Sequence, residues 1–487
     1  MKKSYSRRKI LRSAAVSVSA LAGLRVTVPA RAQFGWMQKP SQQLGRSGPR
    51  KLPFAQDNPA IQYFPQNCER CGDCVAVCQN VQTVYGHGKY PLNTVPCIYC
   101  GQCTAICWNN GVTERFHLQK IYNEITENQK SKGPKKFVAL IAPSVRVTLG
   151  EMFKMERGKN VEKQLISALR KIGFDYVFDV TFGADLTVME EAAELEERLK
   201  KQNDSSDGTS EGVTEGTVKP MFTSCCPAWV RFVELFFPEV LPQLSTCKSP
   251  IQMHAAVLKS WFAKEKGIDA ENLVITAITP CTAKKYERTL GENTPVKYSL
   301  TTRECGWWLQ ELQIPFAQLE DGEFDSTLGN GSGAGVIFGN TGGVTEAVMR
   351  QLYFNRTGQE PPKDFLKFTP VRGMDGYRRA EVEIDGQKLR IGIVHGASTA
   401  RTLLEGKAPL DLHFVEVMAC RGGCIGGGGL PKTEIPISDA LRAQRIRGLY
   451  TTDQEHEIRR SGANPEIQEL YAKFLKEPGN PILHNLK

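Results

Sequence analysis

Phe414-Val-Glu-Val-Met-Ala-Cys-Arg-Gly-Gly-Cys424 is a short apolar run, typical of a β-strand, that ends in a loop with two cysteines. The same arrangement occurs at residues 218–226, which end in Cys225 and Cys226, and at residues 273–281, which end in Cys281. In open α/β sheets, ligands bind outside the carboxyl ends of the strands. We therefore expect three strands to bring five thiols to one edge of the fold. Four thiols could hold an iron–sulfur cubane, which leaves one thiol over.

Short apolar runs alternate with amphipathic stretches along most of the chain, which predicts an α/β fold with one or two largely parallel sheets. The expected strands lie at residues 137–142, 176–180, 218–223, 273–278, 335–338, 391–394 and 414–418. The expected helices lie at residues 161–171, 186–201, 250–265, 345–351, 438–450 and 466–476. A stretch rich in Ser, Gly and acidic residues at 203–216 is typical of a mobile surface loop.

Eight of the fifteen cysteines form a doubled C-x-x-C-x-x-C-x-x-x-C motif, which predicts a small α+β ferredoxin-like domain at residues 63–118. In such motifs the fourth cysteine of each run binds the other cluster. One [4Fe–4S] cluster should therefore be held by Cys68, Cys71, Cys74 and Cys107, and the other by Cys97, Cys100, Cys103 and Cys78. Zinc is the alternative, but structural zinc sites usually have longer gaps between their ligand pairs. For isolated cysteines such as Cys247 and Cys305, burial in the core is the simpler interpretation.

The first 32 residues have the features of a twin-arginine export signal. Arg7 and Arg8 precede an apolar stretch, and Ala30-Arg31-Ala32 offers a cleavage site. The apolar stretch is too short to remain as a membrane span, so we expect a periplasmic protein without one. A basic amphipathic helix is the alternative. Eight of the basic residues behind the formal charge of +10 lie in this segment, so the remainder is nearly neutral and nucleic-acid binding is not indicated.

Three of the motifs together resemble one known family. Thr223-Ser-Cys-Cys-Pro-Ala-Trp229, Pro280-Cys-Thr-Ala-Lys-Lys-Tyr-Glu287 and Glu416-Val-Met-Ala-Cys-Arg-Gly-Gly-Cys424 resemble the signature loops of iron–iron hydrogenases. The resemblance covers about residues 60–487. It implies a two-lobed H-cluster domain with largely parallel sheets at 135–432 and a helical tail at 435–487. This tail is similar to the separate small subunit of some periplasmic relatives. Residues 33–62, rich in Pro, Gly, Gln and Ser, are expected to form a linker or an extended wrapping segment.

The resemblance also implies a cofactor and its ligands. A [4Fe–4S] cubane would be held by Cys226, Cys281, Cys420 and Cys424. Cys424 would also bridge to a two-iron unit that carries carbonyl, cyanide and a dithiolate with a central amine, and the two parts form the H-cluster. Lys284 matches a residue that binds a cyanide, although by itself it would more simply be a surface charge. Pro143 and Ser144 match residues hydrogen-bonded around the diatomic ligands. Phe338 and Met418 match apolar walls that would keep water away from the site, and ordinary core is the alternative.

The remaining thiol, Cys225, matches a proton carrier in this family. The rest of the family's proton path maps onto Glu191, Glu194 and Ser245. Glu191 and Glu194 are three residues apart on an expected helix, so they share one face. Exposed helix carboxylates are the commoner case, and only the resemblance favours a relay.

The expected activity is the interconversion of H2 with protons and electrons, with an external carrier such as a cytochrome or a ferredoxin-like protein. The twin-arginine machinery and the H-cluster maturation enzymes are further expected partners. A non-catalytic iron–sulfur assembly-factor-like protein and a hydrogen sensor are the alternatives. Three positions depart from the family's usual residues near the two-iron unit, and they leave catalytic bias and oxygen tolerance open: Ile251, Thr279 and Leu430.

Overall fold

The computed structural model describes residues 52–88, 95–206, 219–291, 294–362, 365–366, 368–370 and 374–484. The expected export signal at 1–32 lies outside the described residues. So do residues 33–51 of the expected linker and residues 207–216 of the expected surface loop. No helix among the described residues has the length and apolar character needed to cross a membrane.

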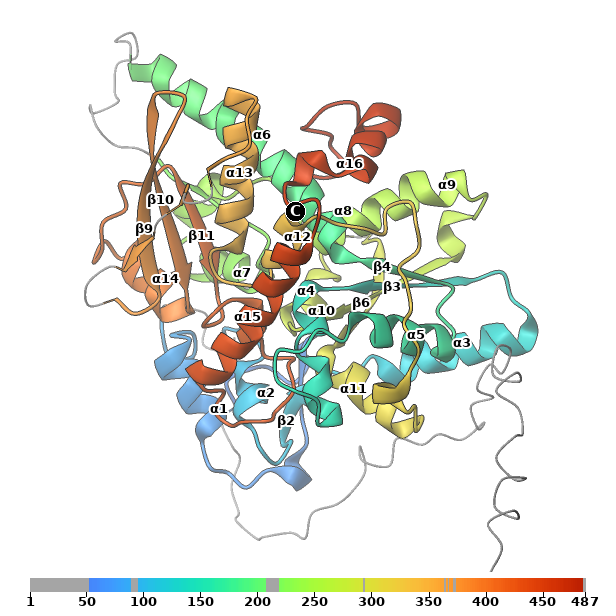
Figure 1. The fold of residues 1–487 in the computed structure, drawn as a ribbon. Helices are drawn as coiled ribbons and strands as arrows, with labels where there is room; N and C mark the ends of the chain where they lie inside the picture. The colour runs from blue at the N-terminus through green and yellow to red at the C-terminus, as the bar shows by residue number, and fades with distance from the viewer. Residues whose placement is uncertain are drawn as a thin grey trace, which may run out of the picture.

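A parallel sheet of order β4-β3-β6-β7 forms the right half of the fold in Figure 1. Its strands are β3 (Lys136–Ile141), β4 (Tyr176–Asp179), β6 (Leu273–Thr279) and β7 (Val296–Thr301). Side chains alternate along a strand, so β3 contributes to two cores. Phe137, Ala139 and Ile141 pack with α3 (Leu118–Ser131), α5 (Glu162–Ile172) and α11 (Thr302–Glu311). Val138 and Leu140 pack with α8 (Pro250–Val257) on the other face. Burial on both faces explains the continuous apolar run of this strand.

A second sheet, of order β5-β11-β10-β9-β8, forms the left half. Its strands are β5 (Met221–Phe222), β8 (Thr369–Pro370), β9 (Tyr377–Ile384), β10 (Gln387–His395) and β11 (Phe414–Met418). β5, β11 and β10 are parallel, whereas β9 and β8 are antiparallel additions. α13 (Gly343–Thr357) covers one face, and α7 (Pro227–Phe236) and α14 (Ala397–Leu404) cover the other.

The helix α6 (Val180–Ser206) packs against both halves. It contacts α8 on the side of the first sheet and α13 on the side of the second, and it also contacts α12 (Gly333–Ile337). Figure 1 shows it running from beside the second sheet into the centre of the molecule. Its 27 residues span about 40 Å, so it can join the interior to the surface.

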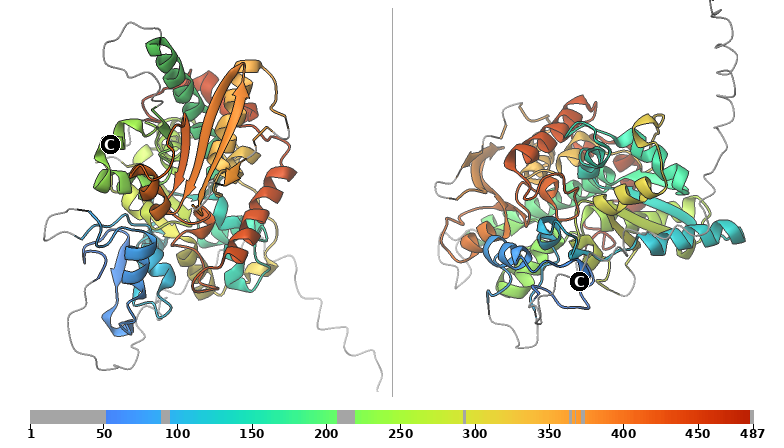
Figure 2. Two further views of the ribbon diagram at one scale, coloured as in Figure 1. Left: turned by 90° about the vertical axis from the view of Figure 1, so that its left-hand side faces the viewer. Right: turned by 90° about the horizontal axis from the view of Figure 1, so that it is seen from below.

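The cysteine-rich unit and the tail pack against this α/β core. β1 (Ile61–Tyr63) pairs antiparallel with β2 (Val112–Glu114), beside α1 (Asp73–Ala76) and α2 (Gln102–Ile106). Figure 2 shows this unit, in blue, at one end of the core. In the tail, α15 (Asp439–Glu455) contacts α12 and α4 (Pro143–Arg146), and α16 (Pro465–Leu470) contacts α6.

The predicted α/β class with largely parallel sheets is confirmed, but one expected strand is wrong. Residues 335–338 form part of α12 and of the turn after it. A four-residue apolar run does not distinguish a strand from a buried helix. Gly335 explains the helix, because a Cβ at this position would lie 2.5 Å from the Thr181 carbonyl oxygen of α6. Close helix–helix contact therefore replaces sheet pairing.

Candidate metal centre

The three cysteine loops meet between the two sheets. Cys225 and Cys226 follow β5, Cys281 follows β6, and Cys420 and Cys424 follow β11. The sequence predicts that these strands bring their thiols to one edge of the fold. In the structure the strands belong to two separate sheets, and their carboxyl ends face a common space. Cys226 also caps α7, and the positive end of a helix of ten residues favours an anionic group at that position.

The thiols of these loops are electrostatic neighbours. Burial and, to a smaller extent, the nearby Cys226 raise the pKa of Cys281 to about 11. Burial likewise raises the pKa of Cys420, helped by Cys281, Cys226 and Cys424. These four thiols therefore lie together in a buried place. Iron binds cysteine as the thiolate, so a cluster held here would take its ligands in that form.

A cavity with about 630 Å³ of empty space opens beside these thiols. Cys225, Cys226, Cys281 and Cys424 line it, which explains why they keep some accessible surface. The five positions that the resemblance places around the cofactor also line this cavity: Pro143, Ser144, Lys284, Phe338 and Met418. Ile251, which departs from the family's usual residue, adds to the apolar wall.

Two polar groups in this wall bear on what the cavity holds. The Ser144 hydroxyl is buried and has no hydrogen-bond partner within the described residues, which is costly unless a bound group accepts its bond. Lys284 Nζ lies 2.9 Å from Glu287 Oε1 and 3.4 Å from the Cys225 carbonyl oxygen. Burial opposes its charge, but Glu287 outweighs burial and raises the pKa of Lys284, which stays an ammonium group. An unpaired hydroxyl and a buried cation both fit an anionic cofactor.

The cysteines lie too far apart for a zinc ion held by three or four thiolates. All fifteen cysteines lie within the described residues, and none forms a disulfide. A tetrahedral zinc site with bonds of about 2.3 Å brings its sulfur atoms within about 4 Å of one another. No three cysteines of the described chain have all their sulfur atoms within 4.8 Å. A cubane is wider than one ion and holds its thiolates farther apart, so this geometry fits [4Fe–4S] clusters.

The two cysteine runs of the N-terminal unit have the same backbone. Arg70 and Gly72 in the first run, and Tyr99 and Gly101 in the second, all have positive φ. The two runs therefore share left-handed residues at equivalent positions, before and after their second cysteine.

The fourth cysteine of each run lies with the other run. Burial and the neighbouring Cys97 raise the pKa of Cys78 to about 12. Cys107, the last of the second run, is a neighbour of Cys71 in the first. Each fourth cysteine thus has a neighbour in the other run, as the motif requires, and the full sets of four ligands stay a prediction.

A direct contact joins the second cysteine run of the ferredoxin-like unit to the cysteine loop that follows β11. Gln102 Nε2 donates to Cys420 Sγ at 3.3 Å and to the Gly426 carbonyl oxygen at 2.9 Å. Cys100 and Cys420 are electrostatic neighbours. A Cβ on Gly428 would lie 2.4 Å from the Cys100 carbonyl oxygen, so the glycine run allows two backbones to touch. Gly428 therefore serves the contact between the two units.

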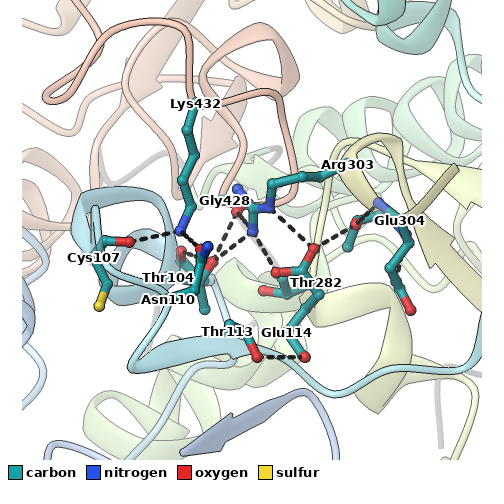
Figure 3. Close-up of polar contacts among 12 residues, drawn as sticks. Thr104, Cys107, Asn110, Thr113, Glu114, Thr282, Arg303, Glu304, Gly428 and Lys432 are labelled. Carbon is teal, nitrogen blue, oxygen red and sulfur yellow. Dashed lines mark hydrogen bonds and ion pairs between the residues drawn. The ribbon is translucent and has the colours of Figure 1, made fainter. Parts of the chain in front are cut away.

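A buried ion pair holds the same two units together (Figure 3). Arg303 Nη2 lies 2.5 Å from Glu114 Oε2, and both side chains are almost fully buried. Arg303 also donates to Thr104 Oγ1 and to the Gly428 carbonyl oxygen, each at 3.0 Å. Nearby, Lys432 Nζ donates to the Cys107 carbonyl oxygen at 2.7 Å. No sequence motif signals this network, because its members lie far apart in the chain.

The residues expected to carry protons lie between the cavity and the surface. Burial and the adjacent Glu194 raise the pKa of Glu191 to about 8, against weaker effects of the Ser245 hydroxyl and the Ser224 amide. Glu191 is among the groups that raise the pKa of Cys225, after burial itself. Ser245 Oγ donates to Glu194 Oε2 at 2.9 Å. Arg198 Nη2, which sequence reasoning missed, donates to Glu194 Oε1 at 2.6 Å.

Together, the sets of thiols and the lined cavity define an iron–sulfur protein with a buried redox centre between its two sheets. Two family models match the chain: "Iron only hydrogenase large subunit, C-terminal domain" at residues 135–428 and "Iron hydrogenase small subunit" at 439–486. The first spans more than half of the chain. The chain therefore belongs to the iron-only hydrogenase family, whose solved members include proteins described with an H-cluster.

Individual relatives agree with this placement. The chain is 39% identical over 426 residues to the NADP-reducing hydrogenase subunit HndD of Solidesulfovibrio fructosivorans, covering 86% of this chain and 65% of the relative. It is 37% identical to the periplasmic [Fe] hydrogenase large subunit of Nitratidesulfovibrio vulgaris, covering 79% and 88%. A solved structure of a variant of the [FeFe]-hydrogenase HydA1 from Chlamydomonas reinhardtii matches with a TM-score of 0.65 and 35% identity, covering 76% of this chain and 98% of that one. The chain thus spans slightly less than two thirds of the first of these relatives.

Proposed function

We propose that this protein interconverts H2 with protons and electrons. One observation carries the proposal. Five cysteines of three separate loops lie close to one buried cavity, and four of them line it. Cys226, Cys281, Cys420 and Cys424 would hold the H-cluster, which supplies the iron site where H2 is split or formed. The N-terminal cysteines would hold two [4Fe–4S] clusters that pass electrons to an external carrier.

The chain's own residues would position the cofactor and move protons. Lys284 would pair its charge with an anionic ligand in the cavity, and Ser144 would donate the hydrogen bond that it lacks among the described residues. Pro143, Phe338 and Met418 would keep water away from the site. Protons would pass between Cys225, Glu191, Ser245 and Glu194, of which the last two are in hydrogen-bond contact.

Hydrogen turnover by matured protein tests this proposal directly. With reduced viologen as the donor, the protein should evolve H2, and with oxidised viologen it should consume H2. The matched control is Cys281→Ala, which removes one core ligand and should abolish both reactions. Turnover that survives in Cys281→Ala, or a wild-type protein that carries all its iron and shows no turnover, would contradict the proposal.

Glu191→Gln should reduce H2 evolution by about 10²- to 10⁴-fold, because an amide does not relay a proton. In the native protein the carboxyl group holds its proton up to about pH 8, whereas the ordinary pKa is 4.5. The folded state therefore binds the proton more tightly, and its stability falls as the pH rises from about 4.5 to 8. Glu191→Gln should remove this slope.

Turnover and unfolding across that pH range measure both effects. Glu197→Gln is the control, because Glu197 lies on the same helix but is exposed and paired with Lys201. A normal rate in Glu191→Gln would remove this residue from the path.

We further propose that the protein is exported to the periplasm by the twin-arginine machinery after its cofactor has been inserted by maturation enzymes. The support is the sequence of residues 1–32 and the similarity to a hydrogenase whose name places it in the periplasm. A reporter fused to residues 1–40 should reach the periplasm. Changing both Arg7 and Arg8 to Lys should retain it in the cytoplasm, and export of the changed reporter would rule out this route.

A non-catalytic role in iron–sulfur assembly is the alternative function. Cytosolic iron–sulfur assembly factors are also related, including narfl of Danio rerio at 25% identity over 385 residues. The hydrogenases are more similar, and this chain keeps Cys225 beside the cavity. Catalysis therefore remains the better-supported proposal.

A further inference from the structure

The C-terminal tail places a histidine at the outer end of the proposed proton path. Lys248 N donates to the Leu483 carbonyl oxygen at 2.9 Å, and Cys247 forms a β-bridge with His484. His484 thereby lies beside α6 and the loop at residues 245–248. Donor atoms of Glu194, Cys247 and His484 all lie within 4.8 Å of one another. No other trio of His, Cys, Asp or Glu side chains among the described residues meets this limit.

We propose that Glu194, Cys247 and His484 form a binding site for a divalent transition-metal ion of the zinc class, and that the bound ion blocks the proton path. A carboxylate, a thiolate and an imidazole are the donors that zinc prefers. Water would complete a tetrahedral site. The nearby cavity supplies access, with about 760 Å³ of empty space bordered by Glu194, Thr246 and His484.

A second carboxylate already orients the histidine. Glu190 accepts hydrogen bonds from the Tyr471 hydroxyl and the Gly479 amide, so it also acts as the acceptor toward His484 Nε2 at 2.9 Å. The ring therefore carries its proton on Nε2 and has a free lone pair on Nδ1. In the absence of metal, His484 Nδ1 lies 2.8 Å from the exposed Thr246 Oγ1. Metal-bound histidines usually have this carboxylate partner on the other nitrogen.

The surrounding charges balance a dication. Glu190, Glu194 and a Cys247 thiolate would carry three negative charges, and Arg198, bound to Glu194 Oε1, carries one positive charge. Lys201 also borders the cavity but pairs with Glu197. Without metal, burial raises the pKa of Cys247, so metal binding releases one proton from the thiol.

The ion would act on the relay through a single atom. Glu194 Oε2 accepts from Ser245 Oγ at 2.9 Å and lies 3.9 Å from Cys247 Sγ. A metal bound to this oxygen would occupy the acceptor that the relay uses. This inhibitory part of the inference rests on the proposed function, whereas the site itself does not.

Zinc binding to the matured protein tests the site without reference to turnover. Anaerobic equilibrium dialysis with Zn²⁺ should find one tight equivalent, which His484→Ala and Cys247→Ala each weaken by at least about tenfold. Glu190→Gln should weaken it by about 10- to 100-fold, since Glu190 only orients the ring. His456→Ala, a change elsewhere in the tail, is the matched control and should bind as the wild type does.

Zinc X-ray absorption should find one sulfur at about 2.3 Å and nitrogen or oxygen at about 2.0–2.1 Å. Unchanged binding in His484→Ala, or two or more sulfur neighbours, would overturn the site. Zinc should slow H2 turnover of the wild type and of His456→Ala but not of His484→Ala. If zinc occupies the site and turnover is unaffected, the blocking role is wrong. If even zinc-free protein shows no turnover, the proposed function fails while the dialysis result still decides the site.

Discussion

Cys225→Ala should retain a complete cofactor and lose turnover by about 10²- to 10⁴-fold, the usual contribution of a positioned proton carrier. The thiol lines the cavity but is left over once four cysteines hold the cluster. Its electrostatic neighbours include both Glu191 and Cys424. A methyl group in its place removes the titratable side chain that connects the cavity to the carboxyl groups of α6.

Iron content and hydrogen turnover of the same preparation give the measurement. Cys305→Ala is the matched control, because Cys305 is a buried cysteine of α11 that packs in the core of the parallel sheet with α3 and α5, away from the cavity. It should keep normal turnover. Near-normal turnover in Cys225→Ala would remove Cys225 from the proton path, and a loss of iron would mean that it serves as a ligand.

Arg303→Met should destabilise the protein by about 3–5 kcal/mol, because it leaves the Glu114 carboxylate buried without its partner. Glu114 is fully buried, and although burial opposes its charge, Arg303 lowers the pKa of Glu114 and keeps it ionised. The change should also loosen the ferredoxin-like unit, since Arg303 bonds to Thr104 and to the Gly428 carbonyl oxygen.

Anaerobic denaturant unfolding measures this loss. The double variant Arg303→Met with Glu114→Leu should recover much of the stability, because it leaves no unpaired charge. Arg157→Met is the control, since its ion pair with Glu434 is exposed and should contribute about 1 kcal/mol or less. Equal losses in Arg303→Met and Arg157→Met would mean that the buried pair does not join the two units.

Local patterns in the sequence account for most of the fold and for the cofactor residues. The apolar run of β3 and the cysteine spacing around Cys68 and Cys97 are short-range signals, and the structure agrees with both. The run at 335–338 is misleading because four residues have no periodicity of their own, and contact with α6 decides their conformation. Part of β10 is predicted at residues 391–394, whereas its antiparallel partner β9 is missed, although buried and charged residues alternate along β9 as in a strand with one exposed face.

The contacts between units could not be predicted from the sequence. Gln102 and Cys420 are 318 residues apart, and Glu194 and His484 are 290 apart, so no motif contains either pair. Gln102 and His484 are ordinary in their local sequence. Only the packing of the ferredoxin-like unit and the tail on the α/β core gives them chemical meaning.

Infrared spectroscopy of protein matured with its assembly enzymes is the most direct test of the account. The central claim is that Cys226, Cys281, Cys420 and Cys424 hold an H-cluster in the cavity between the two sheets. The account predicts absorption bands from carbonyl and cyanide bound to iron, present in the wild type and in Cys225→Ala and absent in Cys281→Ala. Protein that contains both ferredoxin-like clusters and has no such bands would contradict it.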